Sequence, residues 1–247
     1  MKRLVTVTTL AFIPLLGTAS EGGIHLETAN VNLSDQASLQ RGAKYFMNYC
    51  SGCHSLKYAR YNRMAKDLGL TEDQVRENLM FVADSKVGDN ITIAMSEEAG
   101  EKWFGTAIPD LTLVARNRFN GPDWIYTYLK GFYQDEKRPY KVNNIVFPDV
   151  GMPDVLWQMR GLQKAVYKQD HNAAGDPISV FDHFERTGGV SDEQFDEVAR
   201  DLTTFLTYMG EPMQLERRAL GVWVFLFLAV FSTLAYLLKK EYWKDVH

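Results

Sequence analysis

The chain has 247 residues, of which 46% are hydrophobic and 23% charged, a composition typical of a folded protein rather than a disordered or collagen-like one. Acidic residues outnumber basic residues, 31 to 27, and this balance argues against a nucleic-acid-binding protein, which needs basic patches. Both ends of the chain differ in composition from its middle, and each carries an apolar run.

The N-terminal residues 1–20 have the features of a secretory signal peptide. Two basic residues come first, residues 4–16 form an uncharged apolar run, and small residues follow up to Ser20. The alternative is an N-terminal membrane anchor, but a helix of this length covers only about 20 Å of a roughly 30 Å hydrocarbon layer. We therefore predict cleavage near Ala19 or Ser20 and export of the following domain, residues 21–211.

A helix is predicted just before the segment CSGCH, residues 50–54. Apolar or small residues recur at helical spacing at Leu39, Gly42, Ala43, Phe46 and Cys50. This helix would deliver the first cysteine to whatever site the segment forms.

The two cysteines of CSGCH, Cys50 and Cys53, are the only ones in the sequence, and His54 follows directly. A zinc site needs about three or four Cys, His or carboxylate ligands, and the sequence has no second cysteine pair. A thioredoxin-like dithiol normally follows a strand, whereas a helix is predicted before Cys50. The pattern C-x-x-C-H is the signature of covalent haem c attachment, in which each thiol adds to the porphyrin and the histidine binds the iron. We predict one covalent haem c, with His54 as an iron ligand.

The middle of the chain predicts short helices joined by loops. Residues 96–104 and 123–131 have helical character, and no run shows the alternation expected of a long strand.

A second iron ligand is predicted at Met152, in the stretch IVFPDVGMPDVLW. Pro148, Gly151 and Pro153 break regular structure there, so Met152 lies on a loop rather than in a helical stripe. Methionine most often fills a gap in a core. In a chain with a haem to ligate, however, this loop can return over the haem, and a thioether ligand raises the potential, which suits electron transfer. Met95, Met159 and His183 are the alternatives.

The C-terminal part predicts two helices. Ser191 and Gln194 form a capping box before an amphipathic run that ends near Met209, and this helix is expected to pack on the one before CSGCH. After a linker at residues 212–218, residues 219–238 carry no charge and are long enough to cross a bilayer. The signal peptide then leaves residues 239–247 as a cytoplasmic tail.

Four runs follow one another along the chain: RGAKYFMNYCSGCHSLKYARY, IPDLTLVARNRFNG, VFPDVGMP and FLTYMGEPMQLERRALG, the last leading into the membrane helix. Together and in this order they resemble the cytochrome c1 family, the haem c subunits of quinol:cytochrome c oxidoreductase (the cytochrome bc1 complex). The resemblance covers nearly the whole mature chain. It departs from the family at Ile108-Pro109, where a Pro-Pro pair is common, and at residues 161–189, which look like an insertion.

The resemblance implies a mainly α fold: a class I cytochrome c-like haem domain with long loops, plus one C-terminal transmembrane helix. It implies that Cys50 and Cys53 are thioether sites and that His54 and Met152 are axial ligands. It further implies that Arg118 faces a haem propionate and that Pro109 lines the haem pocket. Without this resemblance, the sequence favours a solvated surface position for Arg118.

The function implied is electron transfer, from a Rieske iron-sulfur subunit to a soluble or membrane-bound cytochrome c, within a dimeric complex that includes cytochrome b. The haem domain would lie on the periplasmic side of the inner membrane, and the chain needs no catalytic acid or base of its own. Two alternatives are a freestanding membrane-tethered electron shuttle and a haem sensor with an open iron.

Overall fold

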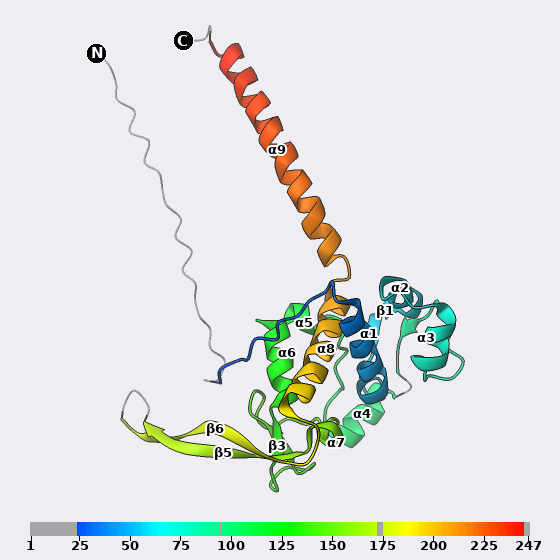
Figure 1. The fold of residues 1–247 in the computed structure, drawn as a ribbon, viewed down its shortest axis with the longest axis vertical. Coiled ribbons are helices and arrows are strands. Elements are labelled where there is room, and N and C mark those ends of the chain that lie inside the picture. Colours follow the sequence, from blue (N-terminus) through cyan, green and yellow to red (C-terminus); the bar gives the residue numbers. More distant parts are fainter. Residues whose placement is uncertain (1–23, 94, 172–174, 245–247) are drawn as a thin grey trace.

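The computed structural model describes residues 24–93, 95–171 and 175–244 (Figure 1). The predicted signal peptide, residues 1–20, lies outside these ranges. In chain order the elements are α1 (Gln36–Tyr45), the π-helix η1 (Phe46–Cys50), β1 (Leu56–Arg60), α2 (Tyr61–Asp67), α3 (Glu72–Asn78), β2 (Asn90–Ile91), α4 (Glu97–Phe104), α5 (Val114–Asn117), α6 (Gly121–Lys130), β3 (Phe132–Gln134), β4 (Val142–Asn144), α7 (Trp157–Arg160), β5 (Leu162–His171), β6 (Pro177–Thr187), α8 (Asp192–Gly210) and α9 (Gln214–Tyr242).

The helices predicted before CSGCH and after Ser191 are both present, as α1 with η1 and as α8, and they pack against each other. At the start of α8, Ser191 and Gln194 form the predicted capping box, each side chain accepting from the other residue's backbone N–H. The helices predicted at residues 96–104 and 123–131 are also present, as α4 and α6.

Gly42 allows α1 and α8 to cross at very short range. A Cβ atom at this position would lie 2.2 Å from the backbone oxygen of Asp201, closer than any side chain can approach. Around the crossing, Ser38 and Arg41 of α1 donate hydrogen bonds to the buried Asp201 carboxylate, at 2.6 Å from the Ser38 hydroxyl and from the Arg41 Nε. The close backbone contact and the hydrogen-bonded, buried Asp201 carboxylate together fix the position of α1 relative to α8.

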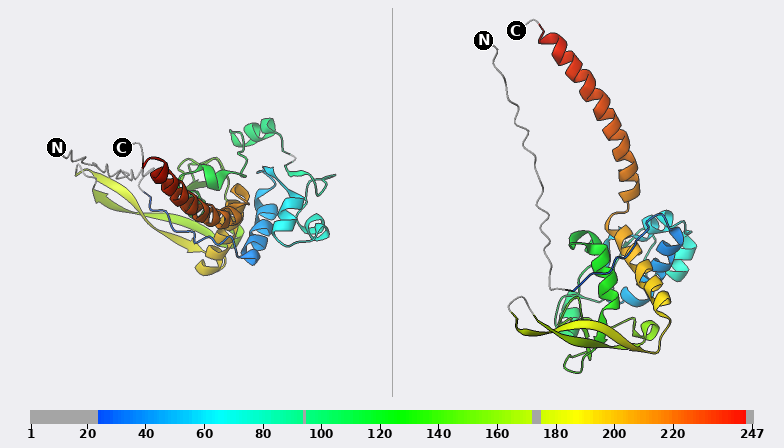
Figure 2. Two further views of the ribbon diagram at one scale, coloured as in Figure 1. Left: turned by 90° about the horizontal axis from the view of Figure 1, so that it is seen from above. Right: turned by 60° about the vertical axis from the view of Figure 1, so that its left-hand side comes forward.

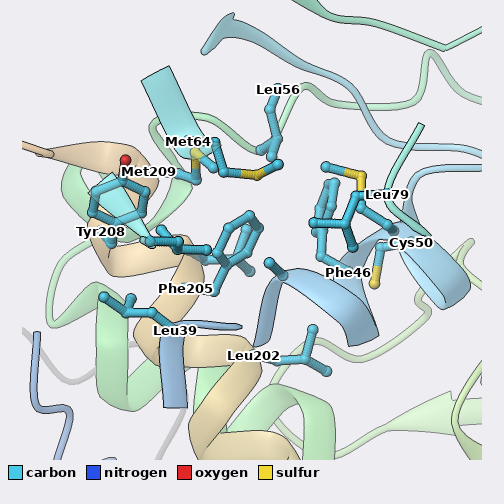
Figure 3. Close-up of a cluster of buried hydrophobic side chains, with 14 of the residues drawn as sticks. Leu39, Phe46, Cys50, Leu56, Met64, Leu79, Leu202, Phe205, Tyr208 and Met209 are labelled. Carbon is cyan, nitrogen blue, oxygen red and sulfur yellow. The ribbon is translucent and has the colours of Figure 1, made fainter. Parts of the chain in front are cut away.

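Apolar side chains from these helices and their neighbours form one core (Figure 3). Burying each of its larger side chains contributes about 1.5–3 kcal/mol relative to exposure. The residues that Figure 3 labels in this core are Leu39, Phe46, Cys50, Leu56, Met64, Leu79, Leu202, Phe205, Tyr208 and Met209. The first cysteine of CSGCH is part of this core, so the site is built directly onto it.

The expectation that the chain has no long strand was wrong. Strands β5 and β6 form a long antiparallel hairpin that extends to one side of the helices (Figures 1 and 2). Its base packs against β3, where the buried Gln163 side chain donates to the backbone oxygen of Phe132 at 2.5 Å and also to that of Lys130, at the end of α6, at 2.8 Å. Both strands, residues 162–171 and 177–187, belong to the segment that looked like an insertion.

Helix α9 stands apart from the rest of the molecule (Figure 1). It is 29 residues long, its most apolar window has a mean hydropathy of 2.2, and none of that window is buried. It starts at Gln214, within the predicted linker, because Pro212 cannot continue α8 whereas the residues from 214 onward favour a helix. An apolar helix with no protein cover fits a membrane anchor.

Candidate haem site

All the residues predicted for the site line one cavity of about 770 Å³, within the range of cofactor pockets. They are Cys50, Cys53, His54, Pro109, Arg118 and Met152. Further walls come from α6 and from Leu202 and Leu206 of α8, so the cavity borders the crossing of α1 and α8. Segments about 100 positions apart in the sequence therefore meet around one space.

A π-helical turn that ends at Cys50, followed by a tight turn, leads the two thiols and the imidazole to this cavity. The Ser51 N–H donates to the Phe46 carbonyl, five residues earlier, at 2.9 Å. The chain then turns tightly, because the N–H groups of Cys53 and His54 both donate to the Cys50 carbonyl, at 3.1 and 2.8 Å. Single π-turns are rare and are frequent at functional sites.

The environment of the thiols argues against a redox dithiol. Burial raises the pKa of Cys50 to about 12 and also raises the pKa of the partly buried Cys53. Reactive C-x-x-C pairs have lowered thiol pKa values, which favour the nucleophilic thiolate. The geometry here therefore suits thiols held as attachment points more than thiols that exchange disulfides.

The imidazole of His54 is oriented by a backbone carbonyl. Its Nδ1 lies 2.8 Å from the carbonyl oxygen of Pro109, which can only accept, so Nδ1 carries the proton. His54 is only 8% exposed. Burial lowers its pKa, although the Pro109 carbonyl and Asp110 oppose this shift. The neutral ring keeps the Nε2 lone pair free, as in histidines that bind metals.

The loop that carries Met152 is tied to helix α6 by Asn144, which is fully buried. The Asn144 Oδ1 accepts hydrogen bonds from the N–H groups of Val146 and Phe147, at 2.9 and 3.2 Å. Its Nδ2 donates to the backbone oxygen of Tyr128 at 2.8 Å. The position of Met152 over the cavity is therefore fixed relative to α6.

Arg118 lies at the edge of the cavity and is half-buried rather than a freely solvated charge. Its guanidinium carbon lies 3.7 Å from the centre of the Trp124 ring and 5.8 Å from that of Phe147. Such stacking leaves the guanidinium edge free to donate hydrogen bonds to a carboxylate.

This donor set fits haem c. Among the histidines and methionines that the structure describes, only His54 and Met152 line the cavity. The described ranges contain no group of three or more His, Cys, Asp or Glu side chains arranged for a metal ion. The site thus offers two attachment points, one nitrogen ligand, one sulfur ligand and a cation at the rim, which match the needs of a covalent haem.

Sequence reasoning missed two groups of this site, Tyr128 and Asn144. The Tyr128 hydroxyl lies 3.3 Å from the Met152 sulfur. Tyrosine in an amphipathic helix gives no signal of such a role, because aromatic residues there most often fill the core. The dipeptide Asn143-Asn144 is a turn signal, but its hydrogen bonds to the Met152 loop depend on the fold.

Comparison with known proteins identifies the family to which the chain belongs. The sequence profile described as "Cytochrome C1 family" matches residues 28–246. The chain is 57% identical to "Cytochrome c1" of Allochromatium vinosum, over 100% of both chains, and 39% identical to "Ammonia monooxygenase gamma subunit" of Nitrosomonas europaea, over 95% of this chain and 94% of that one. It is 28% identical to "Cytochrome b/c1" of Bradyrhizobium diazoefficiens, over 86% of this chain and 34% of that longer one. The chain therefore belongs to the cytochrome c1 family.

Proposed function

We propose that this chain accepts single electrons from a Rieske iron-sulfur subunit and passes them to a cytochrome c, as the haem subunit of a quinol:cytochrome c reductase. The observation that carries the proposal is the single cavity in which the C-x-x-C-H turn and Met152 meet, on a domain joined to one apolar helix. The identity of 57% to a cytochrome c1 over the full length supports it.

As a cytochrome c1, the chain carries one covalent haem c and takes part in electron transport. When bound, the haem supplies reversible one-electron transfer between the ferric and ferrous states. In our proposal, Cys50 and Cys53 would form the thioether bonds, and His54 and Met152 would bind the iron.

The remaining proposed roles concern orientation and charge. Arg118 offsets the charge of a haem propionate, and Pro109 lines the pocket while its carbonyl holds the His54 ring. The chain belongs to an oxidoreductase complex but supplies no acid or base of its own, because electron transfer needs fixed ligands and electrostatics rather than proton transfer at this site.

The proposed location is the inner membrane, with the haem domain in the periplasm and the tail after Leu238 in the cytoplasm. The apolar helix α9 and the signal-like N-terminal residues support this orientation. Protease added to sealed spheroplasts should digest the haem domain and spare a tag placed after His247. The reverse pattern would contradict the orientation.

The proposed partners are cytochrome b and a Rieske subunit, in a dimeric complex with a cytochrome c as acceptor. The relative named "Cytochrome b/c1", a longer chain of which this one matches 34%, supports an association with cytochrome b. A freestanding electron shuttle would have the same haem site but no such partners. A haem sensor would leave the iron open, whereas the meeting of His54 and Met152 at one cavity favours a closed one.

Purification in mild detergent tests the proposed function directly. A tag on this chain should co-purify a cytochrome b and an iron-sulfur protein, and the preparation should reduce a soluble cytochrome c when quinol is added. Isolation of the chain alone would favour the freestanding shuttle. Co-purification with ammonia monooxygenase subunits would instead favour the role that the name of the Nitrosomonas relative implies.

A further inference from the structure

The hydroxyl of Tyr128 points at the sulfur of Met152. The two atoms are 3.3 Å apart, within hydrogen-bond range for sulfur, with the hydroxyl as donor. Both residues line the cavity, Tyr128 from helix α6 and Met152 from the loop after β4. A thioether sulfur has two lone pairs, so this contact occupies one and leaves the other for a metal.

The ring of Tyr128 is held on two sides. The Trp124 ring stacks on it, with centroids 4.8 Å apart and planes 13° apart, and the Phe132 ring meets it edge-on at 5.0 Å. Trp124 is in turn covered by the Arg118 guanidinium at 3.7 Å. Packing against these two rings restrains the side chain and so keeps its hydroxyl near the sulfur.

The Met152 loop and helix α6 are also held in a fixed position relative to each other. The buried Asn144 side chain bonds the Tyr128 backbone oxygen and, at its other end, the backbone at the start of the Met152 loop. The hydroxyl and the sulfur therefore meet because two independent restraints place them: the aromatic stack on α6 and the amide bridge from β4.

We propose that Tyr128 is a positioning residue for the Met152 thioether, and that its hydrogen bond raises the haem potential by drawing electron density from the sulfur. This inference rests on the proposed ligation of the haem by Met152. A weaker sulfur donor stabilises the ferric state less than the ferrous state, and hydrogen bonds to metal ligands are a recognised way in which proteins tune potentials.

The test is a redox titration of the purified holoprotein carrying Tyr128→Phe, with Tyr126→Phe as the matched control. Both changes remove one hydroxyl from α6 and keep the ring, but the Tyr126 hydroxyl lies 3.5 Å from the Lys130 ammonium and does not face the cavity. We expect Tyr128→Phe to lower the midpoint potential by up to about 59 mV, a tenfold change in the ferric-to-ferrous ratio for one electron. The ferric absorption band that reports sulfur ligation should shift in Tyr128→Phe and stay in place in Tyr126→Phe.

A third variant, Met152→Leu, separates the two ways in which the inference could fail. If Met152→Leu loses the sulfur band while Tyr128→Phe keeps the wild-type band and potential, the Tyr128 role is wrong and the ligation stands. If Met152→Leu leaves the band and potential unchanged, both the ligation and the Tyr128 role are wrong. Equal shifts of the midpoint potential in Tyr128→Phe and Tyr126→Phe would also overturn the inference. They would show that loss of either hydroxyl from α6 changes the potential, whether or not it contacts the Met152 sulfur.

Discussion

The Nδ1 atom of His54 lies 2.8 Å from the carbonyl oxygen of Pro109, which belongs to the segment between α4 and α5. This contact fixes the tautomer and the plane of the ring. Because histidines that bind metals almost always donate their second N–H to such a partner, the segment around Pro109 is part of the site although it offers no ligand itself.

The Pro109 segment depends in turn on the carboxylate of Asp110. Its oxygens accept hydrogen bonds from the Ser55 hydroxyl at 2.8 Å and from the backbone N–H groups of Lys57 and Thr112 at 2.7 and 3.0 Å. Burial raises the pKa of Asp110, but these bonds outweigh it and the pKa is lowered overall.

We therefore expect Asp110→Ala to lower the free energy of unfolding by about 1–3 kcal/mol, the cost of leaving these donors without their acceptor. Urea unfolding of the full chain in detergent measures this effect. Asp89→Ala is the control, because that carboxylate accepts from the Lys86 N–H at an exposed turn away from the site. Equal stability of the two variants would contradict a supporting role for Asp110.

Replacement of Gly42 tests the helix crossing behind the site. The added Cβ of Gly42→Ala would lie 2.2 Å from the Asp201 backbone oxygen and 2.7 Å from the Phe205 Cβ, so α1 and α8 must move apart. We expect the free energy of unfolding to fall by about 1–3 kcal/mol, typical of overpacking, and the yield of attached haem to fall, because Cys50 lies in η1, which continues α1 directly. Gly88→Ala is the control, since a Cβ there meets nothing within 4 Å. Thermal unfolding that is unchanged in Gly42→Ala would show that the crossing is loose.

Lys130 gives a prediction at high pH. Burial lowers its pKa, but ion pairs with Asp196, at 2.8 Å, and with Glu27 raise it from the ordinary value of 10.5 to about 12. A raised pKa means that the stabilising contribution is fully present below pH 10.5 and is lost as the pH rises through about 12.

Lys130→Met should therefore lower the free energy of unfolding by about 1–2 kcal/mol at pH 8, and this deficit should shrink once the pH passes 10.5. Urea unfolding at a series of pH values measures the difference from wild type. Lys66→Met, which removes an exposed lysine, should show no such dependence. A deficit that grows with pH would have the wrong sign and would exclude the ion pairs as its cause.

The parts of the fold that could be predicted are those in which local pattern and tertiary packing agree. The capping box at Ser191 and the helical spacing before Cys50 each describe a helix with one buried face, and both helices form. At Met152 the surrounding prolines and glycine predicted a loop, and the structure brings that loop to the cavity that His54 lines.

The hairpin of β5 and β6 could not be predicted by alternation, because that signal requires one buried face. Apart from Gln163 near its base, most of its residues are exposed on both faces, so polar and apolar residues mix along each strand. The contact between Tyr128 and Met152 was missed for a different reason: it depends on how Asn144 joins α6 to a loop, which no local pattern records.

The ferric absorption spectrum of Met152→Leu tests the central claim, that Met152 completes a haem site begun by Cys50, Cys53 and His54. The substitution nearly conserves volume, so a packing role alone should cost less than about 1.5 kcal/mol and leave the spectrum unchanged. Met159→Leu is the matched control, because Met159 packs against the core and does not line the cavity. We predict that Met152→Leu keeps covalent haem, loses the band that reports sulfur ligation and gains carbon monoxide binding, whereas Met159→Leu changes none of these. A wild-type spectrum in Met152→Leu would contradict the claim and move the ligand elsewhere.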